Sequence, residues 1–150
     1  MITKTIQNLQ PGFDERGGVR ALGKVRLKRL QQELAGVERL TAAFLIGSAA
    51  RNQLRPDSDI DIAILLKSGT SFSPFEKINL AVRLGELCSR EVDLGMLESQ
   101  NLVYAREAYL TGECIYCRDV FAKDLFGATI LGLYAALKGC RKEVEDAYRN

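Results

Sequence analysis

Apolar and polar positions follow two periods along the chain, and the period changes from segment to segment. Apolar residues at spacings of three and four predict helices over 14–35, 74–89 and 120–148, with a shorter helix over 101–110. Pro74 suits the first turn of the second of these helices. Alternating or short apolar runs predict strands over 38–46, 59–66, 91–98 and 114–118. This order is typical of an α/β (α+β) domain, in which a single mixed β-sheet of about four strands is flanked by helices.

The length of the chain is that of one folded unit. We therefore predict a single domain over residues 1–150. Within it, residues 1–35 are expected to form an N-terminal helical extension and residues 36–98 the core that carries the chemistry. Residues 120–148 are expected to form a long C-terminal helix.

That C-terminal helix carries an apolar seam, which we define as Phe126, Ile130, Leu133, Leu137, Cys140 and Val144. Steps of four and three residues place these side chains along one face of a helix. Such a face either packs on the core of its own domain or receives a partner helix, and the sequence leaves both open. The basic segment 16–29 is a second candidate docking face, with an ordinary solvated surface as the alternative.

Composition narrows the class of protein. Apolar residues make up 47% of the chain and charged residues 27%, which is typical of a soluble globular protein. The net charge of +2 gives no support for direct nucleic-acid binding. No apolar run reaches the about 18 residues that cross a membrane, and the first ten residues lack the apolar core of a signal peptide. We therefore expect a cytoplasmic protein without a membrane segment.

The chain contains no histidine, and this absence limits its chemistry. Catalysis by a Ser-His or Cys-His arrangement is excluded, so acid–base work falls to carboxylates, lysine, tyrosine or a metal-bound water. Cys114 and Cys117 form a CxxC pair, but a zinc site usually needs four ligands. We interpret these two cysteines as small apolar residues, and expect all four cysteines of the chain to be reduced thiols.

Two carboxylates stand one residue apart inside an apolar run, ten residues after a Gly-Ser pair, in LIGSAARNQLRPDSDIDIAILL. Because side chains alternate along a strand, Asp59 and Asp61 share one face with Cα atoms roughly 6–7 Å apart. Ile60 and Ile62 point the other way, toward the core. Two like charges beside an apolar strand repel each other, which favours a bound cation. Magnesium fits because it prefers carboxylate and phosphate oxygens.

Asp93 supplies a third carboxylate within the alternating strand EVDLGMLE. If that strand lies beside the strand over 59–66, its carboxylate converges with those of Asp59 and Asp61. Three acids can hold two metal ions about 3.5–4 Å apart, the arrangement used for in-line phosphoryl displacement.

The Gly-Ser pair is placed to bind phosphates. It ends a strand where a short helix, 48–53, is expected to begin, and helix N-termini offer free N–H groups to anions. Gly47 allows close approach of the backbone, the Ser48 hydroxyl can donate a hydrogen bond, and Arg51 can add a charge-assisted one. Triphosphate on the turn and metal on the aspartates together describe a nucleotide site.

The segment GSAARNQLRPDSDIDIAILL resembles the GS-x10-DxD signature of the DNA polymerase β-like nucleotidyltransferase superfamily. The short chain and the single added aspartate in EVDLGML resemble its minimal nucleotidyltransferase (MNT) branch. The resemblance covers most of the chain and is weakest over the first 35 residues. It implies a mixed sheet flanked by helices, and magnesium-dependent transfer of a nucleoside monophosphate from an NTP to an acceptor hydroxyl.

The resemblance also assigns roles to the motif residues. It implies that Gly47 and Ser48 hold the triphosphate, that Asp59 and Asp61 bind metal, and that Asp93 completes the metal site and helps to activate the acceptor oxygen. The chain departs from the usual GSxARG at one position, where Asn52 follows the arginine.

Many members of the MNT branch are antitoxins that add AMP to a tyrosine of a HEPN ribonuclease toxin. The resemblance therefore implies ATP as substrate, two Mg²⁺ ions as cofactors and a cognate HEPN toxin as partner, in a hetero-oligomer or homo-oligomer. A protein acceptor also agrees with the length of the chain, because little is left to enclose a small molecule. Two alternatives remain: a nucleotidyltransferase acting on a small hydroxyl compound such as an aminoglycoside, and a non-catalytic antitoxin that binds the toxin.

Overall fold

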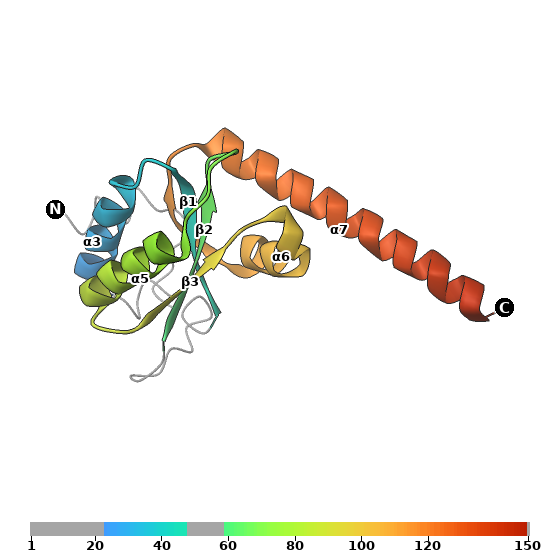
Figure 1. Cartoon of the computed structure of the whole chain (residues 1–150), viewed down its shortest axis with the longest axis horizontal. Coiled ribbons are helices and arrows are strands. Elements are labelled where there is room, and N and C mark those ends of the chain that lie inside the picture. Colours follow the sequence, from blue (N-terminus) through green and yellow to red (C-terminus); the bar gives the residue numbers. More distant parts are fainter. Residues whose placement is uncertain (1–22, 48–58, 150) are drawn as a thin grey trace.

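A computed structural model of the chain describes residues 23–47 and 59–149 (Figure 1). Its elements, in chain order, are α3 (Lys24–Ala35), β1 (Leu40–Ile46), β2 (Ile60–Leu66), α5 (Pro74–Cys88), β3 (Val92–Met96), the 3₁₀ turn η1 (Ser99–Asn101), α6 (Leu102–Thr111), β4 (Glu113–Cys117) and α7 (Val120–Arg149). The predicted order of strands and helices is confirmed over these residues. The predicted helix 48–53 and the beginning of the predicted helix 14–35 lie outside them.

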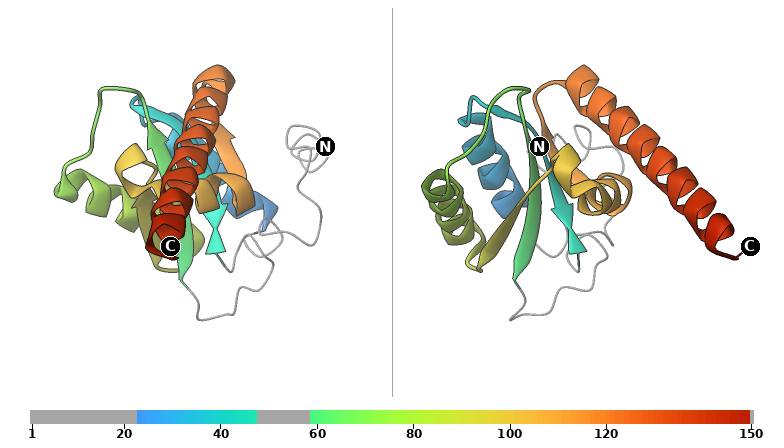
Figure 2. Two further views of the ribbon diagram at one scale, coloured as in Figure 1. Left: turned by 90° about the vertical axis from the view of Figure 1, so that its right-hand side faces the viewer. Right: turned by 45° about the vertical axis from the view of Figure 1, so that its right-hand side comes forward.

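The four strands form one mixed sheet, as predicted, and their order in it is β3-β2-β1-β4. Strand β1 runs antiparallel to both β2 and β4, whereas β2 and β3 are parallel. Parallel neighbours need a crossover connection, and α5 supplies it. Helices α3 and α5 lie on one face of the sheet, and α6 and the beginning of α7 lie on the other (Figures 1 and 2).

Alternation in β2 divides its side chains between these two faces. Ile60, Ile62 and Ile64 are fully buried against the α3 and α5 side. Ala63 and Leu65 belong to the second core cluster, beneath α6 and α7. Asp61 shares that second face and stands at the end of the strand where the core stops. The fold therefore places a carboxylate at the edge of a packed layer.

Local sequence explains where α5 begins. Pro74 occupies its first turn, as predicted, and the Ser73 hydroxyl accepts a hydrogen bond of 3.1 Å from the Glu76 N–H. The first turn of a helix has N–H groups without a partner inside the helix. Here the capping serine accepts from one of them, and the proline has no N–H to satisfy. The crossover between the two parallel strands is thus well defined at its entry.

Helix α7 packs only with its first part. Gly127 and Ile130 are buried, and a methyl group at position 127 would lie 2.1 Å from Tyr109 Cζ, so α7 approaches α6 closely there. The guanidinium of Arg106 stacks over the ring of Tyr134 at 4.3 Å. Beyond this contact the helix extends away from the body of the molecule (Figure 2).

The apolar seam of α7 is therefore split. Core packing is the correct interpretation for Phe126 and Ile130, which belong to or pack against the second core cluster. It is wrong for the outer part of the seam, Leu133, Leu137, Cys140 and Val144, whose side chains are exposed. Helical periodicity is the same for both environments, so only the position of the body decides between them.

Among the described helices, α7 alone is long and apolar enough to cross a membrane by length and composition. Its uncharged stretch runs only from Leu125 to Leu137, because Asp124 precedes it and Lys138 follows it. This stretch of 13 residues is shorter than the about 17–25 that a membrane helix needs.

Candidate active site

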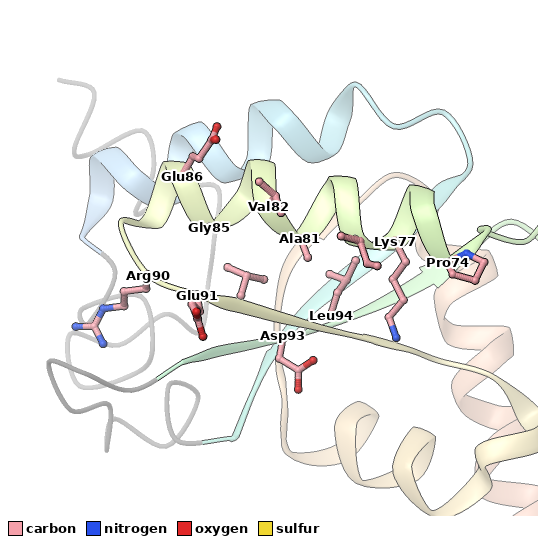
Figure 3. Close-up of a pocket in the computed structure, with 12 residues that line it drawn as sticks. Pro74, Lys77, Ala81, Val82, Gly85, Glu86, Arg90, Glu91, Asp93 and Leu94 are labelled. Carbon is pink, nitrogen blue, oxygen red and sulfur yellow. The ribbon is translucent and has the colours of Figure 1, made fainter.

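The register of β2 and β3 brings two of the predicted acids together. Asp61 and Asp93 are direct partners across the parallel pair, on neighbouring strands about 4.8 Å apart. The Asp93 carboxylate points away from α5 (Figure 3), toward the face that also carries Asp61. Asp59 immediately precedes β2 and is exposed.

The electrostatics of this group favour a cation. Burial raises the pKa of Asp61, and the carboxylates of Asp93 and then Asp59 raise its pKa further. All three effects oppose a negative charge on Asp61, so a bound divalent ion would relieve them together. Within residues 23–47 and 59–149, no three His, Cys, Asp or Glu side chains already stand close enough to hold a metal ion. The expected convergence of Asp59, Asp61 and Asp93 on a metal ion therefore stays a prediction from the sequence.

Gly47 lies directly beside Asp61. It follows Ile46, the residue that pairs with Asp61 across β1 and β2, and its φ of +70° is in the left-handed region. A methyl group at this position would lie 2.7 Å from Asp61 Oδ2. The absence of a side chain is thus required twice, by the backbone conformation and by the carboxylate that lies against it. Gly47, immediately after β1, therefore lies against one member of the acidic pair.

Two predicted phosphate-binding residues, Ser48 and Arg51, lie outside the described residues. Their predicted roles therefore rest on the sequence. Among the described residues, the structure brings together Gly47, Asp61 and Asp93, with Asp59 immediately before β2.

Tyr104 joins this group and was missed from the sequence. Its hydroxyl lies against the backbone of Gly95, where a methyl group would be 1.8 Å from Tyr104 Oη. Burial raises the pKa of Tyr104, and the charges of Asp61 and then Asp93 raise its pKa further. The phenol therefore stays protonated beside the acids. A glycine inside a strand pattern can signal such a close approach, and Gly95 was the available signal.

Comparisons with known proteins place the chain in a family. The model of the family "Polymerase beta, Nucleotidyltransferase" matches residues 28–121, which is more than half of the chain. The chain therefore belongs to the polymerase β nucleotidyltransferase family. The comparison with curated protein sequences gives no match.

Solved structures share the fold at low sequence identity. One is a toxin–antitoxin complex with AMP-PNP, with a TM-score of 0.67, 22% identity, and coverage of 86% of this chain and 100% of that chain. A second is the MntA–HepT toxin–antitoxin complex, at 0.64 and 21%, covering 85% and 100%. A third contains a tri-AMPylated Shewanella oneidensis HEPN toxin with its MNT antitoxin, at 0.64 and 21%, covering 85% and 98%. At identities this low, the structural likeness establishes a shared fold and no more.

Proposed function

We propose that this protein is an antitoxin that transfers AMP from ATP to a hydroxyl, expected to be a tyrosine, of a cognate HEPN ribonuclease toxin. The observation that carries the proposal is the Asp61–Asp93 pair across β2 and β3, with Gly47 in contact with Asp61. Membership of the nucleotidyltransferase family supports the reaction class. The toxin–antitoxin complexes that share the fold support the partner.

The acidic residues have distinct roles in this proposal. Asp59, Asp61 and Asp93 would hold two Mg²⁺ ions, which neutralise phosphate charge and polarise the reacting oxygens. Asp93 accepts the proton of the acceptor hydroxyl, whose oxygen then bonds to the α-phosphorus. The bond from that phosphorus to the β-phosphate oxygen breaks, and pyrophosphate leaves. The protein supplies orientation and charge rather than a covalent intermediate.

The phosphate-binding bend completes the site. Gly47 allows the backbone to approach the triphosphate, and Ser48 and Arg51 are proposed to donate to its oxygens. Tyr104 packs against Gly95 and borders the acidic pair, so we assign it a positioning role. Its protonated hydroxyl adds no negative charge to a site that already carries too much.

The outer part of the α7 seam is proposed to contact the toxin. Leu133, Leu137 and Val144 are 45%, 43% and 55% exposed, on a helix that extends from the body. Contiguous exposed apolar side chains of this kind mark protein contacts. A toxin that binds there would be the protein acceptor of the reaction. We expect the antitoxin and its toxin to act in the cytoplasm.

The test is transfer itself. The protein is incubated with the purified toxin, ATP and Mg²⁺, and the intact mass of the toxin is measured. A gain of one or more AMP units is expected with the natural sequence, and no gain with Asp61→Asn or Asp93→Asn. Neutralisation of the toxin by wild-type protein without any adduct would contradict the catalytic proposal and leave an antitoxin that acts by binding.

A further inference from the structure

A groove runs along the outer edge of the sheet, between α5 and β3, with a volume of about 740 Å³ (Figure 3). Its apolar lining comes from Ile78, Ala81 and Val82 on α5 and from Leu94 on β3. Ile78 and Val82 are 62% and 54% exposed, although both belong to the helix that covers the core. Asp93 also contributes to the lining of this groove, but its carboxylate points away from α5, to the opposite face of β3.

The backbone of β3 is available for pairing along this groove. In the described sheet, β3 has β2 as its one neighbour. The Glu91 carbonyl accepts from Ile60 N–H and the Leu97 N–H donates to the Ile64 carbonyl, both at 2.9 Å. Because alternate residues of a parallel strand bond to the same neighbour, the residues between them aim their N–H and C=O groups at the outer edge. These residues are Val92, Leu94 and Met96.

The two faces of β3 differ in chemistry. Leu94 points toward α5 and is buried, whereas Asp93 points to the opposite face, and Asp61 is its register partner on β2. An extended segment added at this edge would alternate in the same way. One of its side chains would face Ile78 and Val82, and the next would face the acidic pair.

We propose that the acceptor protein docks as an added strand on the outer edge of β3, which no described strand covers. Apolar side chains of its segment fill the α5–β3 groove, and the residue between them presents its hydroxyl to Asp93. The recognised pattern is therefore apolar, hydroxyl-bearing, apolar. This docking rests on the proposed function, because it describes how the acceptor of that reaction is held. Main-chain pairing gives affinity, and alternate side chains give specificity.

The first test removes the apolar lining without adding charge. The double variant Ile78→Gln and Val82→Gln is compared with a matched double variant, Val120→Gln and Phe121→Gln, at residues that are 60% and 78% exposed outside the groove. The groove variant is expected to raise KM for the toxin at least tenfold, with KM for ATP within twofold of wild type. The matched variant is expected to leave both within twofold. An unchanged KM for the toxin in the groove variant would overturn the docking.

The second test reads the alternation directly. In a Cys140→Ser background, Val82→Cys is mixed under oxidising conditions with toxins that carry a single cysteine near the AMP-accepting residue. A toxin cysteine one position from the AMP-accepting residue would face α5 and should form the disulfide. A toxin cysteine two positions from that residue would share its face, away from α5, and should not. Equal cross-linking at both positions, or none at either, would overturn strand addition.

The two proposals fail differently. If wild-type protein adds no AMP to the toxin, the proposed function is wrong. If wild-type protein adds AMP and the groove variants do so with unchanged KM and without the alternating cross-links, the function stands and the docking alone is wrong.

Discussion

Replacement of Gly47 by alanine should separate the backbone requirement of the bend from its contact with Asp61. Gly47 has a φ of +70°, and an L-residue in the left-handed region costs about 1–2 kcal/mol. The added methyl group would lie 2.7 Å from Asp61 Oδ2, which is too close for any real contact. Because the carboxylate is the end of a side chain, it would rotate away rather than displace the strand.

The structure supplies a control for this experiment. Gly69 has a φ of +79°, but a methyl group there would meet nothing within 4 Å. Gly69→Ala therefore carries the same backbone cost without touching the site. For a chain of this size, a loss of about 1 kcal/mol lowers Tm by roughly 2–4 °C. Both variants should lose about 2–8 °C in Tm.

Only one of them should lose activity. A displacement of about 1 Å in a reacting group can reduce a rate about 100-fold. We therefore expect Gly47→Ala to reduce AMP transfer to the toxin by about two orders of magnitude, and Gly69→Ala to stay within about twofold. Single-turnover transfer and thermal unfolding measure the two effects separately. Wild-type activity in Gly47→Ala, or an equal loss in Gly69→Ala, would refute the proposed contact between the bend and the carboxylate.

Three further predictions concern stability and reactivity. Burial and the neighbouring carboxylates raise the pKa of Asp61 in the folded protein above its value in the unfolded chain. The free energy of unfolding therefore falls as the pH rises from the unfolded pKa through the folded pKa. Asp61→Asn should therefore have a higher Tm than wild type at pH 7 without Mg²⁺, by an amount that shrinks toward pH 4; a lower Tm at pH 7 would contradict this. Arg118 donates hydrogen bonds of 2.6 Å to the carbonyls of Ala35 and Glu38, at and just after the end of α3. Arg118→Ala should cost about 1–3 kcal/mol in urea unfolding, and an unchanged midpoint would show that solvent replaces both bonds. Cys88 is fully buried and burial raises its pKa to about 11, so at pH 8 a thiol reagent should modify Cys140 quickly and Cys88 only on unfolding.

The sequence predicts the sheet and its acidic face because both depend on alternation within short strands. Ile60 and Ile62 are buried and Asp61 takes the other face, which follows from a period of two. The pairing of Asp61 with Asp93 required one assumption, that the two strands are neighbours, and the parallel register satisfies it. These features are local or nearly so, which is why pattern and spacing suffice.

Other features depend on how distant elements pack, and the sequence does not contain them in readable form. Tyr104 reaches Gly95 only because α6 lies across the sheet, and no local period predicts that crossing. Leu133 and Leu137 continue the same helical stripe as Ile130, yet they are exposed because the body of the molecule ends there. Helical periodicity predicts that one face of the helix is apolar, but it does not predict which element covers that face.

The parallel pairing of β2 and β3 has a consequence for when the acidic pair forms during synthesis. A hairpin could bring two acids together as soon as its turn was made, but these acids are separated by a whole helix. Until a nascent chain has emerged as far as Met96, β3 is incomplete and Asp93 cannot pair with Asp61. Strand pairing over such a sequence separation is slow compared with local helix formation. The acidic pair is thus a late event of folding, and a chain that ends within α5 would lack Asp93 altogether.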